Sequence, residues 1–188
     1  MRCELMQPPA ELRFTAAGEG YDIAREGGRL AVAAVACGHR TAIAGSHPMR
    51  GGRHFAECEV VEASGGVILG LAARGLDLEA VSFTQAGFWG MHSDDGALVH
   101  GGGGAHWAGQ QGFGAGDTIG LLLDCDAGTL AVYKNGARLG QGVAPGMRTT
   151  LGNTKEVAGL QGQELCWAVS LGGTGAAVRV ASKPLPAA

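Results

Sequence analysis

Residues 116–136 read GDTIGLLLDCDAGTLAVYKNG, and the class of structure follows from this stretch. Apolar residues recur at every second position, at 119, 121 and 123 and again at 130 and 132, which is the period of a β-strand. Between these runs, Asp126-Ala127-Gly128 places a turn-forming Asp before a glycine that is free to adopt positive φ. Asn135-Gly136 is a strong hairpin signal, since both central residues of a type I′ turn need φ above zero. The stretch therefore predicts three antiparallel strands joined by two tight turns.

Short apolar runs separated by turn residues continue on both sides of this stretch. We expect further strands at 12–14, 21–23, 30–35, 41–44, 54–61, 67–72, 98–100, 165–171 and 177–180. A single helical turn is predicted at 76–80, and residues 46–53, with Pro48 and two glycines, are predicted to form a loop. Many short strands at turn-separated intervals predict an all-β fold, a sandwich of two antiparallel sheets.

Composition limits the class of protein. Apolar residues make up 46% of the chain and charged residues 16%, which is typical of a folded protein. The net charge is −3 and no run of Lys or Arg occurs, so we expect no nucleic-acid partner. No apolar stretch approaches the roughly 20 residues that cross a membrane, and Glu4 and Gln7 stand where a signal peptide would be apolar. With an odd number of cysteines, five, the chain is predicted to be intracellular, in the cytoplasm, with reduced thiols.

A chain of 188 residues is long enough for one domain with its own core. We expect residues 1–10 to form a flexible N-terminal tail, which Pro8-Pro9 closes. Residues 11–182 are expected to form a single domain, and 183–188 a C-terminal tail.

Four sequence blocks, in this order, resemble the SPRY domain of the B30.2/SPRY-like family. They are GRHFAECEV at 52–60, VILGLA at 67–72, FWGMHSDDG at 88–96, and the block from Gly116 to Gly140 that contains the opening stretch. The third block resembles the corresponding block of Ran-binding-type SPRY proteins. When the final strands are included, the resemblance covers residues 46–180. It implies a bent, concanavalin-like β-sandwich. It further implies a non-catalytic protein–protein interaction module, an adaptor or scaffold without a cofactor.

The resemblance places the partner-binding surface on loops at one end of the sandwich. A rigid scaffold holds such loops in place, so little ordering entropy is lost when a partner binds. The candidate loops are 41–54, 81–88, 101–106 and 172–175. The candidate contact residues are His47, Met49, Arg50, Phe83, position 86 (Ala86, which follows Gln85), His106 and Trp107.

Well-understood peptide binders of the family recognise an acidic-Asn motif. They use a Tyr ahead of the Trp-Gly block and a Trp after the last long strand. This chain has Phe83 and Gly172-Gly173 at the corresponding places, so we do not expect it to share that motif preference.

Several residues fit either a structural or a functional role. Trp89 and Trp167 lie within apolar strand patterns and are predicted to be core, whereas Trp107 fits the core or a binding anchor equally well. Asp94 and Asp95 are adjacent, so they are predicted to form a turn rather than a facing pair of catalytic carboxylates. We expect no metal site, because residues 124–126 mimic only the start of a calcium loop and the histidines show no zinc spacing.

Two other functions stay open. A structural subunit of a large intracellular assembly, such as a cytoskeletal or ciliary complex, would suit a chain that is nearly all SPRY-like. A carbohydrate-binding sandwich is the second alternative, since lectins share this general architecture, although architecture alone is a weak argument for function.

Overall fold

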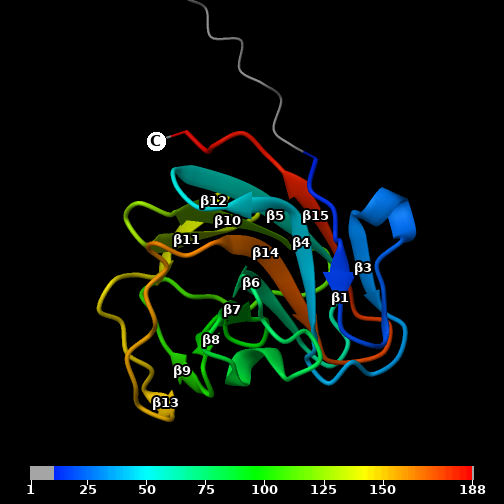
Figure 1. The fold of residues 1–188 in the computed structure, drawn as a ribbon, viewed down its shortest axis with the longest axis horizontal. Helices are drawn as coiled ribbons and strands as arrows, with labels where there is room; N and C mark the ends of the chain where they lie inside the picture. The colour runs from blue at the N-terminus through cyan, green and yellow to red at the C-terminus, as the bar shows by residue number, and fades with distance from the viewer. Residues whose placement is uncertain (1–10, 188) are drawn as a thin grey trace, which may run out of the picture.

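The structure, a computed structural model, describes residues 11–187. The predicted N-terminal tail, residues 1–10, and Ala188 lie outside the described residues. Two antiparallel sheets pack face to face in a sandwich (Figure 1), which confirms the predicted all-β class. No helix within the described part of the chain has the length and apolar character needed to span a membrane.

The first sheet has eight strands in the order β1-β4-β14-β6-β7-β8-β9-β13. Their bounds are β1 (Ala16–Ala17), β4 (Thr41–Met49), β14 (Leu165–Leu171), β6 (Val67–Ala73), β7 (Phe88–His92), β8 (Leu98–His100), β9 (Gly103–Ala105) and β13 (Leu151–Gly152). The second sheet has seven strands in the order β12-β11-β10-β5-β15-β3-β2. Their bounds are β12 (Ala137–Val143), β11 (Thr129–Lys134), β10 (Thr118–Asp124), β5 (Arg53–Glu62), β15 (Ala177–Ser182), β3 (Leu30–Ala33) and β2 (Tyr21–Asp22). Two short 3-10 turns, η1 (Arg25–Gly28) and η2 (Ser82–Thr84), lie in the connections.

The three strands β10, β11 and β12 form the meander that the opening stretch predicts. Asn135 (φ 50°) and Gly136 (φ 84°) both adopt left-handed backbone between β11 and β12. At the turn before β11 the acceptor is Asp124 rather than Asp126, because Asp124 Oδ1 accepts the backbone N–H groups of residues 126 and 127 at 3.1 and 2.8 Å. The Asp126 carboxylate instead accepts the Gly52 N–H, at 3.2 Å, from the connection between β4 and β5.

The inner faces of the two sheets enclose a large apolar core. Trp89 and Trp167 are buried there, as predicted, and the Trp89 Nε1 donates to the Ala158 carbonyl at 2.9 Å. Trp107 is only 9% exposed, and its Nε1 donates to the Gly96 carbonyl at 2.8 Å. The indole is therefore buried in the large core with its N–H satisfied, which favours a core role for Trp107.

Strand boundaries differ from the predicted ones at the start of the chain. Leu12 and Phe14 are buried, yet their backbone is irregular and β1 begins only at Ala16. β2 stops before Ile23, and β3 ends at Ala33, which leaves Val35 exposed. Burial alone therefore does not make a strand here, because the backbone also needs a partner strand in register.

Two predicted loops and one predicted helical turn are also corrected. β4 continues to Met49 through Pro48, so most of the predicted loop 46–53 is strand. Half of the glycine-rich segment 101–106 is strand as well, since β9 pairs with β8 and β13. The predicted helical turn at 76–80 does not form, and the helical turn of this connection is η2.

The outer face of the first sheet carries a second, smaller apolar cluster. Side chains alternate along β14, so that Trp167 faces the large core while Cys166 and Ala168 face outward. Together with Ile68 and Phe88 they are covered by the connection between β6 and β7, residues 74–87, which packs Leu76 and Phe83 against them. This connection positions both surfaces described below.

Candidate functional site

Two of the four candidate loops are joined directly by backbone hydrogen bonds. The Gly102 N–H donates to the Phe83 carbonyl at 2.7 Å, and the Gly101 N–H donates to the Gln85 carbonyl at 3.2 Å. The segment 81–88 therefore lies against the segment 101–106.

A third candidate loop, 172–175, is linked to this place through His39. The His39 ring makes an edge contact with Phe83 at 5.6 Å between centroids, and its carbonyl accepts the Ser82 N–H at 2.9 Å. The Gly172 Cα lies so close to the imidazole that an added Cβ would come within 2.8 Å of His39 Nε2. We call these three loops, with His39, the loop end of the sandwich.

His39 was not among the predicted contact residues. It adopts left-handed backbone (φ 62°), which is uncommon for a residue other than glycine. Its ring also lies 6.2 Å from the His92 ring. Burial lowers the pKa of His39, and the neighbouring His92 lowers it further, so the ring is held neutral near pH 7. The sequence offered only a weak sign of this residue, the turn-forming Gly38 beside it.

A hollow of about 370 Å³ opens at the loop end. Apolar side chains of Phe83, Val99 and Leu151 line it, and the glycines of 102–104 leave its wall without side chains. Leu151 is 45% exposed. His92, Asp94 and Asp95 form the polar edge, where His92 Nδ1 accepts the Asp94 N–H at 3.2 Å. The hollow thus combines apolar contact area with an acidic edge.

The fourth candidate loop, 41–54, is mostly strand β4, and its turn at 50–52 lies at the end of β4 that points away from the loop end (Figure 1). His47 Nε2 lies 3.3 Å from His54 Nδ1, and His54 Nε2 donates to the Gly51 carbonyl at 2.8 Å. Burial and the neighbouring His54 lower the pKa of His47. Arg50 is exposed, and its Nε donates to Glu164 Oε2 at 2.6 Å. Met49 is fully buried in the core, so its side chain is not available to a partner.

His106, the last residue of the segment 101–106, and Trp107 lie beside the turn at 94–96. The exposed His106 accepts a hydrogen bond at Nδ1 from Gln110 Nε2 at 2.9 Å, and Gln110 Oε1 accepts the Trp107 backbone N–H at 2.8 Å. Because Trp107 is buried, we remove it, like Met49, from the proposed contact surface. Of the predicted residues, Phe83 and the exposed Ala86 and His106 belong to the segments of the loop end.

Polar groups that could suggest chemistry have structural partners. Asp95 Oδ1 accepts the Ala97 N–H at 2.9 Å, as expected of a turn. Across residues 11–187, no group of three or more His, Cys, Asp or Glu side chains is placed to hold a metal ion. Cys37, Cys58, Cys125 and Cys166 are free and buried. Burial raises the pKa of Cys58 to about 12 and that of Cys166 to about 11, which keeps both thiols protonated and poorly nucleophilic.

Comparison with known proteins gives this fold a family. The family model described as SPRY domain matches residues 54–180, and the chain therefore belongs to the SPRY family. Domains of this family generally act as non-catalytic interaction modules that bind proteins or peptides. No curated protein matches the sequence.

Solved SPRY structures share the architecture at low sequence identity. The SPRY domain of human HERC1 is 20% identical, with a TM-score of 0.63 over 88% of this chain and 99% of that one. A human SPRY domain is 18% identical, with a TM-score of 0.59 over 87% and 97% of the two chains. The TRIM65 PSpry domain is 15% identical, with a TM-score of 0.60 over 94% and 93%. At these identities the likeness establishes the fold alone.

Proposed function

We propose that this chain is a non-catalytic protein-interaction module that binds a partner protein or peptide through the loop end. The observation that carries this proposal is the hydrogen-bonded junction of segments 81–88 and 101–106 around the hollow that contains Phe83 and Leu151. Phe83, the glycines of 102–104 and Leu151 come from three segments of the chain that the sandwich brings together around this hollow. A site that is ordered before its partner arrives loses little entropy on binding.

The hollow favours a partner of a particular chemistry. Phe83, Val99 and Leu151 offer apolar contact, and an apolar side chain seated at the centre of an interface contributes much of its energy. Asp94 and Asp95 stand at the edge, where they favour a Lys or Arg beside that side chain. We therefore expect a partner segment with an apolar residue next to a basic one.

The cysteines support a place inside the cell. All four cysteines of the described residues are free, whereas disulfides form and persist in secreted proteins. The proposed module accordingly acts on an intracellular partner.

The test is capture of partners from the source cell, read by mass spectrometry, with wild type and two matched variants. Leu151→Asp places a charge in the hollow, while Leu185→Asp makes the same change at a residue of nearly equal exposure, 45% against 47%, in the C-terminal segment. The partner should be lost with Leu151→Asp and kept with Leu185→Asp, and purified partner should then show the same difference in Kd. Circular dichroism confirms that both variants are folded. Equal retention by the two variants would remove the hollow from the binding surface.

A further inference from the structure

A large irregular bulge interrupts the pairing of β4 with β14 in the first sheet. Leu165 of β14 pairs with Met49 of β4, but Trp167, two residues further along, pairs with Ala44. Residues 45–48 of β4 therefore stand opposite Cys166 alone. Such a bulge bends its strand away from the partner strand, and here it opens the outer face of the sheet above Cys166.

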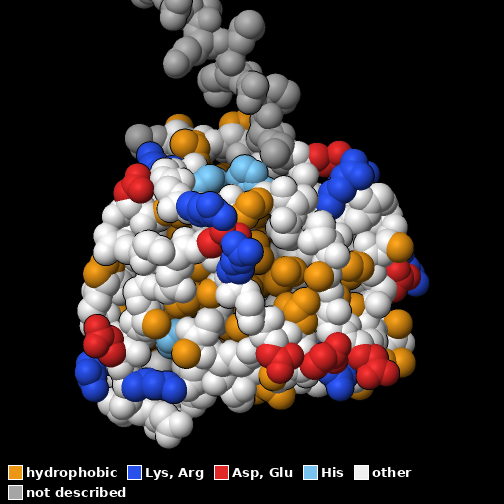
Figure 2. Space-filling model, viewed as in Figure 1, with side chains coloured by type: hydrophobic (Ala, Val, Ile, Leu, Met, Phe, Trp, Pro, Cys, Tyr) orange, Lys and Arg blue, Asp and Glu red, His pale blue; other side chains and the backbone are white. Residues whose placement is uncertain are grey.

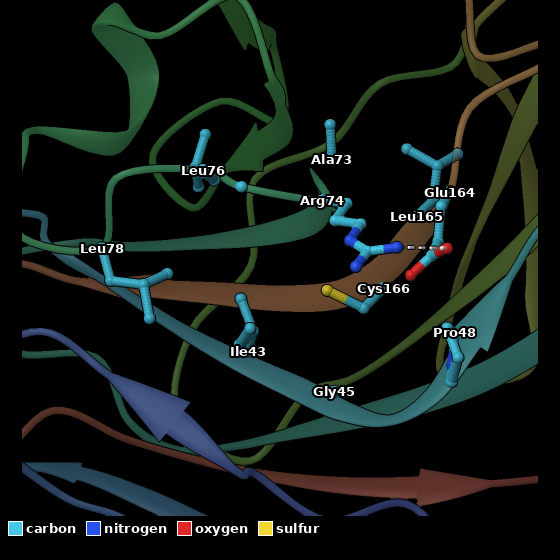
Figure 3. Close-up of a pocket in the computed structure, with 11 residues that line it drawn as sticks. Ile43, Gly45, Pro48, Ala73, Arg74, Leu76, Leu78, Glu164, Leu165 and Cys166 are labelled. Atoms are coloured by element: carbon cyan, nitrogen blue, oxygen red, sulfur yellow. Dashed lines mark ion pairs between the residues drawn. The ribbon is translucent and has the colours of Figure 1, made fainter.

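The opening is an apolar groove of about 200 Å³ (Figure 3). Ile43 and Pro48 of β4 form one wall, Leu76 and Leu78 of the 74–87 connection form the other, and Cys166 lies at the floor. The groove shares no lining residue with the hollow at the loop end. Its volume is below that of a typical small-molecule pocket and suits one large apolar side chain.

Positive charge is in excess at one end of the groove. Arg50 and Arg74 both reach the same oxygen, Glu164 Oε2, which lies 2.6 Å from Arg50 Nε and 3.6 Å from Arg74 Nη1. One carboxylate cannot neutralise two guanidinium groups, and apart from Arg74 and Glu164 the residues that line the groove carry no charge. The two Arg side chains are 68% and 76% exposed, so their remaining N–H donors can reach a ligand.

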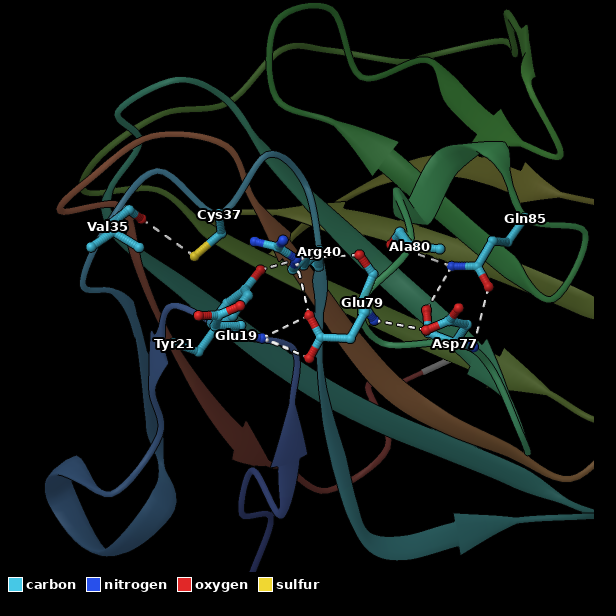
Figure 4. Close-up of polar contacts among 9 residues, drawn as sticks. All are labelled: Glu19, Tyr21, Val35, Cys37, Arg40, Asp77, Glu79, Ala80 and Gln85. Carbon is cyan, nitrogen blue, oxygen red and sulfur yellow. Dashed lines mark hydrogen bonds and ion pairs between the residues drawn. The ribbon is translucent and has the colours of Figure 1, made fainter.

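The opposite rim is acidic. Asp77 and Glu79 alternate with the groove-lining Leu76 and Leu78, and Figure 2 shows apolar side chains between basic and acidic groups on this face. Glu79 is held by Arg40 at 3.0 Å and by the Glu19 N–H at 2.9 Å (Figure 4). A ligand carboxylate is attracted to the Arg50 and Arg74 end and repelled by the acidic rim, which fixes one orientation.

We propose that this groove is a second peptide-binding site, which holds one apolar side chain while a neighbouring Asp or Glu pairs with Arg74 and Arg50. Guanidinium groups suit this role because they offer several donors to a carboxylate in a fixed geometry. The occupant is a partner segment of the Leu-Asp type, and the site acts in addition to the loop end.

The experiment is an NMR titration of the 15N-labelled chain with N-acetyl-Leu-Asp-amide. Saturable shifts are expected at the amides of Gly45, Leu76 and Cys166 and not at Leu151. The Leu-Lys analogue loses an exposed ion pair and should bind about two- to fivefold more weakly. The Ala-Asp analogue loses most of the apolar contact and should bind about tenfold more weakly.

Two variants of exposed residues test the role of charge. Arg74→Glu should abolish the preference for the Leu-Asp probe over the Leu-Lys probe, whereas Arg138→Glu makes the same change on β12 of the other sheet and should preserve it. The absence of saturable groove shifts with 20 mM probe, or equal binding of all three probes, would overturn the proposal. Groove shifts that depend on protein concentration without probe would assign the groove to a second copy of the chain, which also overturns it.

The proposal and the proposed function fail separately. Leu151→Asp should leave the probe titration unchanged, because the groove does not include Leu151. Probe shifts confined to the loop end would refute the second site and leave the first intact.

Discussion

At the scale of single residues, His100, the last residue of β8, has its ring and both ring nitrogens in contact with neighbouring residues. Its ring stacks on Trp89 at 5.2 Å, its Nδ1 donates to the Phe88 carbonyl at 2.8 Å, and its Nε2 accepts the Ala158 N–H at 3.2 Å. A proton added at Nε2 would face the Ala158 N–H and break that bond. Burial lowers the pKa of His100, so the folded state holds it neutral.

This arrangement predicts that acidification destabilises the fold. In the unfolded chain His100 takes up a proton near its ordinary pKa of about 6.5, while in the folded chain it does so only at lower pH. Below that ordinary pKa the unfolded state binds more protons, and the free energy of unfolding should decrease as the pH falls toward the folded pKa. Urea unfolding at pH 7.5, 6.5 and 5.5 measures this decrease.

A His100→Gln variant serves as the control for the pH series. It lacks the titrating ring, and its free energy of unfolding should change less between pH 7.5 and 5.5 than that of wild type, even if it is less stable throughout. His39 and His47, whose pKa values are also lowered, should account for part of the remaining change. An identical pH dependence in the variant would show that His100 does not contribute.

At the scale of elements, the turn between β11 and β12 is held from outside as well as by its own backbone. The Thr118 N–H donates to Asn135 Oδ1 at 2.9 Å, and Asn135 Nδ2 donates to Asp117 Oδ1 at 2.9 Å. The hydrogen bond from Asn135 is the main cause that lowers the pKa of Asp117, and the Gly114 N–H and Lys134 lower it further. The segment before β10 thereby fixes the turn that follows β11.

Gly136 of this turn gives a prediction about backbone conformation alone. Its φ is 84°, and a Cβ added there would meet no atom within 4 Å. Gly136→Val should therefore destabilise the protein by about 1–2 kcal/mol through left-handed backbone strain and not through a clash. Gly136→Asn should be less destabilising, because Asn tolerates this region better. Thermal unfolding that ranks the two variants equally would contradict this explanation.

The difference between local signals and long-range contacts explains how far the sequence predicts the elements. The meander from β10 to β12 depends on alternation and turn residues that are neighbours in the chain, so it could be predicted. Residues 46–49 could not, because Pro48 and the nearby glycines are typical of a loop, while β4 regains a register partner at Met49 only through Leu165 of β14, far along the chain. Leu12 and Phe14 show the reverse case, since their alternation reflects burial without a partner strand.

The candidate site was predictable only in part, for a similar reason. Phe83 lies in a loop that the family resemblance indicates. Leu151, on the other side of the hollow, is brought there by the pairing of β13 with β9, and its glycine- and threonine-rich surroundings give no periodic pattern. The burial of Met49 and Trp107 depends on packing between distant segments, which residue type alone does not determine.

At the scale of the whole molecule, Cys58 reports on the integrity of the sandwich. It lies on β5, between β10 and β15, where its register partners are Ile119 and Val180. Its side chain is buried and its pKa is raised to about 12, so the thiol becomes reactive only when the second sheet opens.

We expect alkylation of Cys58 by iodoacetamide at pH 8 to follow global unfolding. Peptide mapping by mass spectrometry should show little modification in buffer and a sharp increase across the urea transition that tryptophan fluorescence reports. Cys166, at the floor of the groove, is the internal comparison and should react earlier in the transition or at the same point, but never after Cys58. Rapid modification of Cys58 in buffer would mean that the sheet opens locally.

The connection of residues 74–87 serves two surfaces at once. Leu76 and Leu78 form a wall of the groove, and Phe83 lines the hollow, while Gln85 Nε2 ties the two parts together by donating to the Asp77 carbonyl at 2.8 Å (Figure 4). If a ligand at either surface shifts this connection, each ligand must change the affinity of the other by the same factor, because such coupling is reciprocal. Insertions or deletions in this one segment would then alter both specificities together, so a redesign of either surface has to treat the whole connection as a single interchangeable unit.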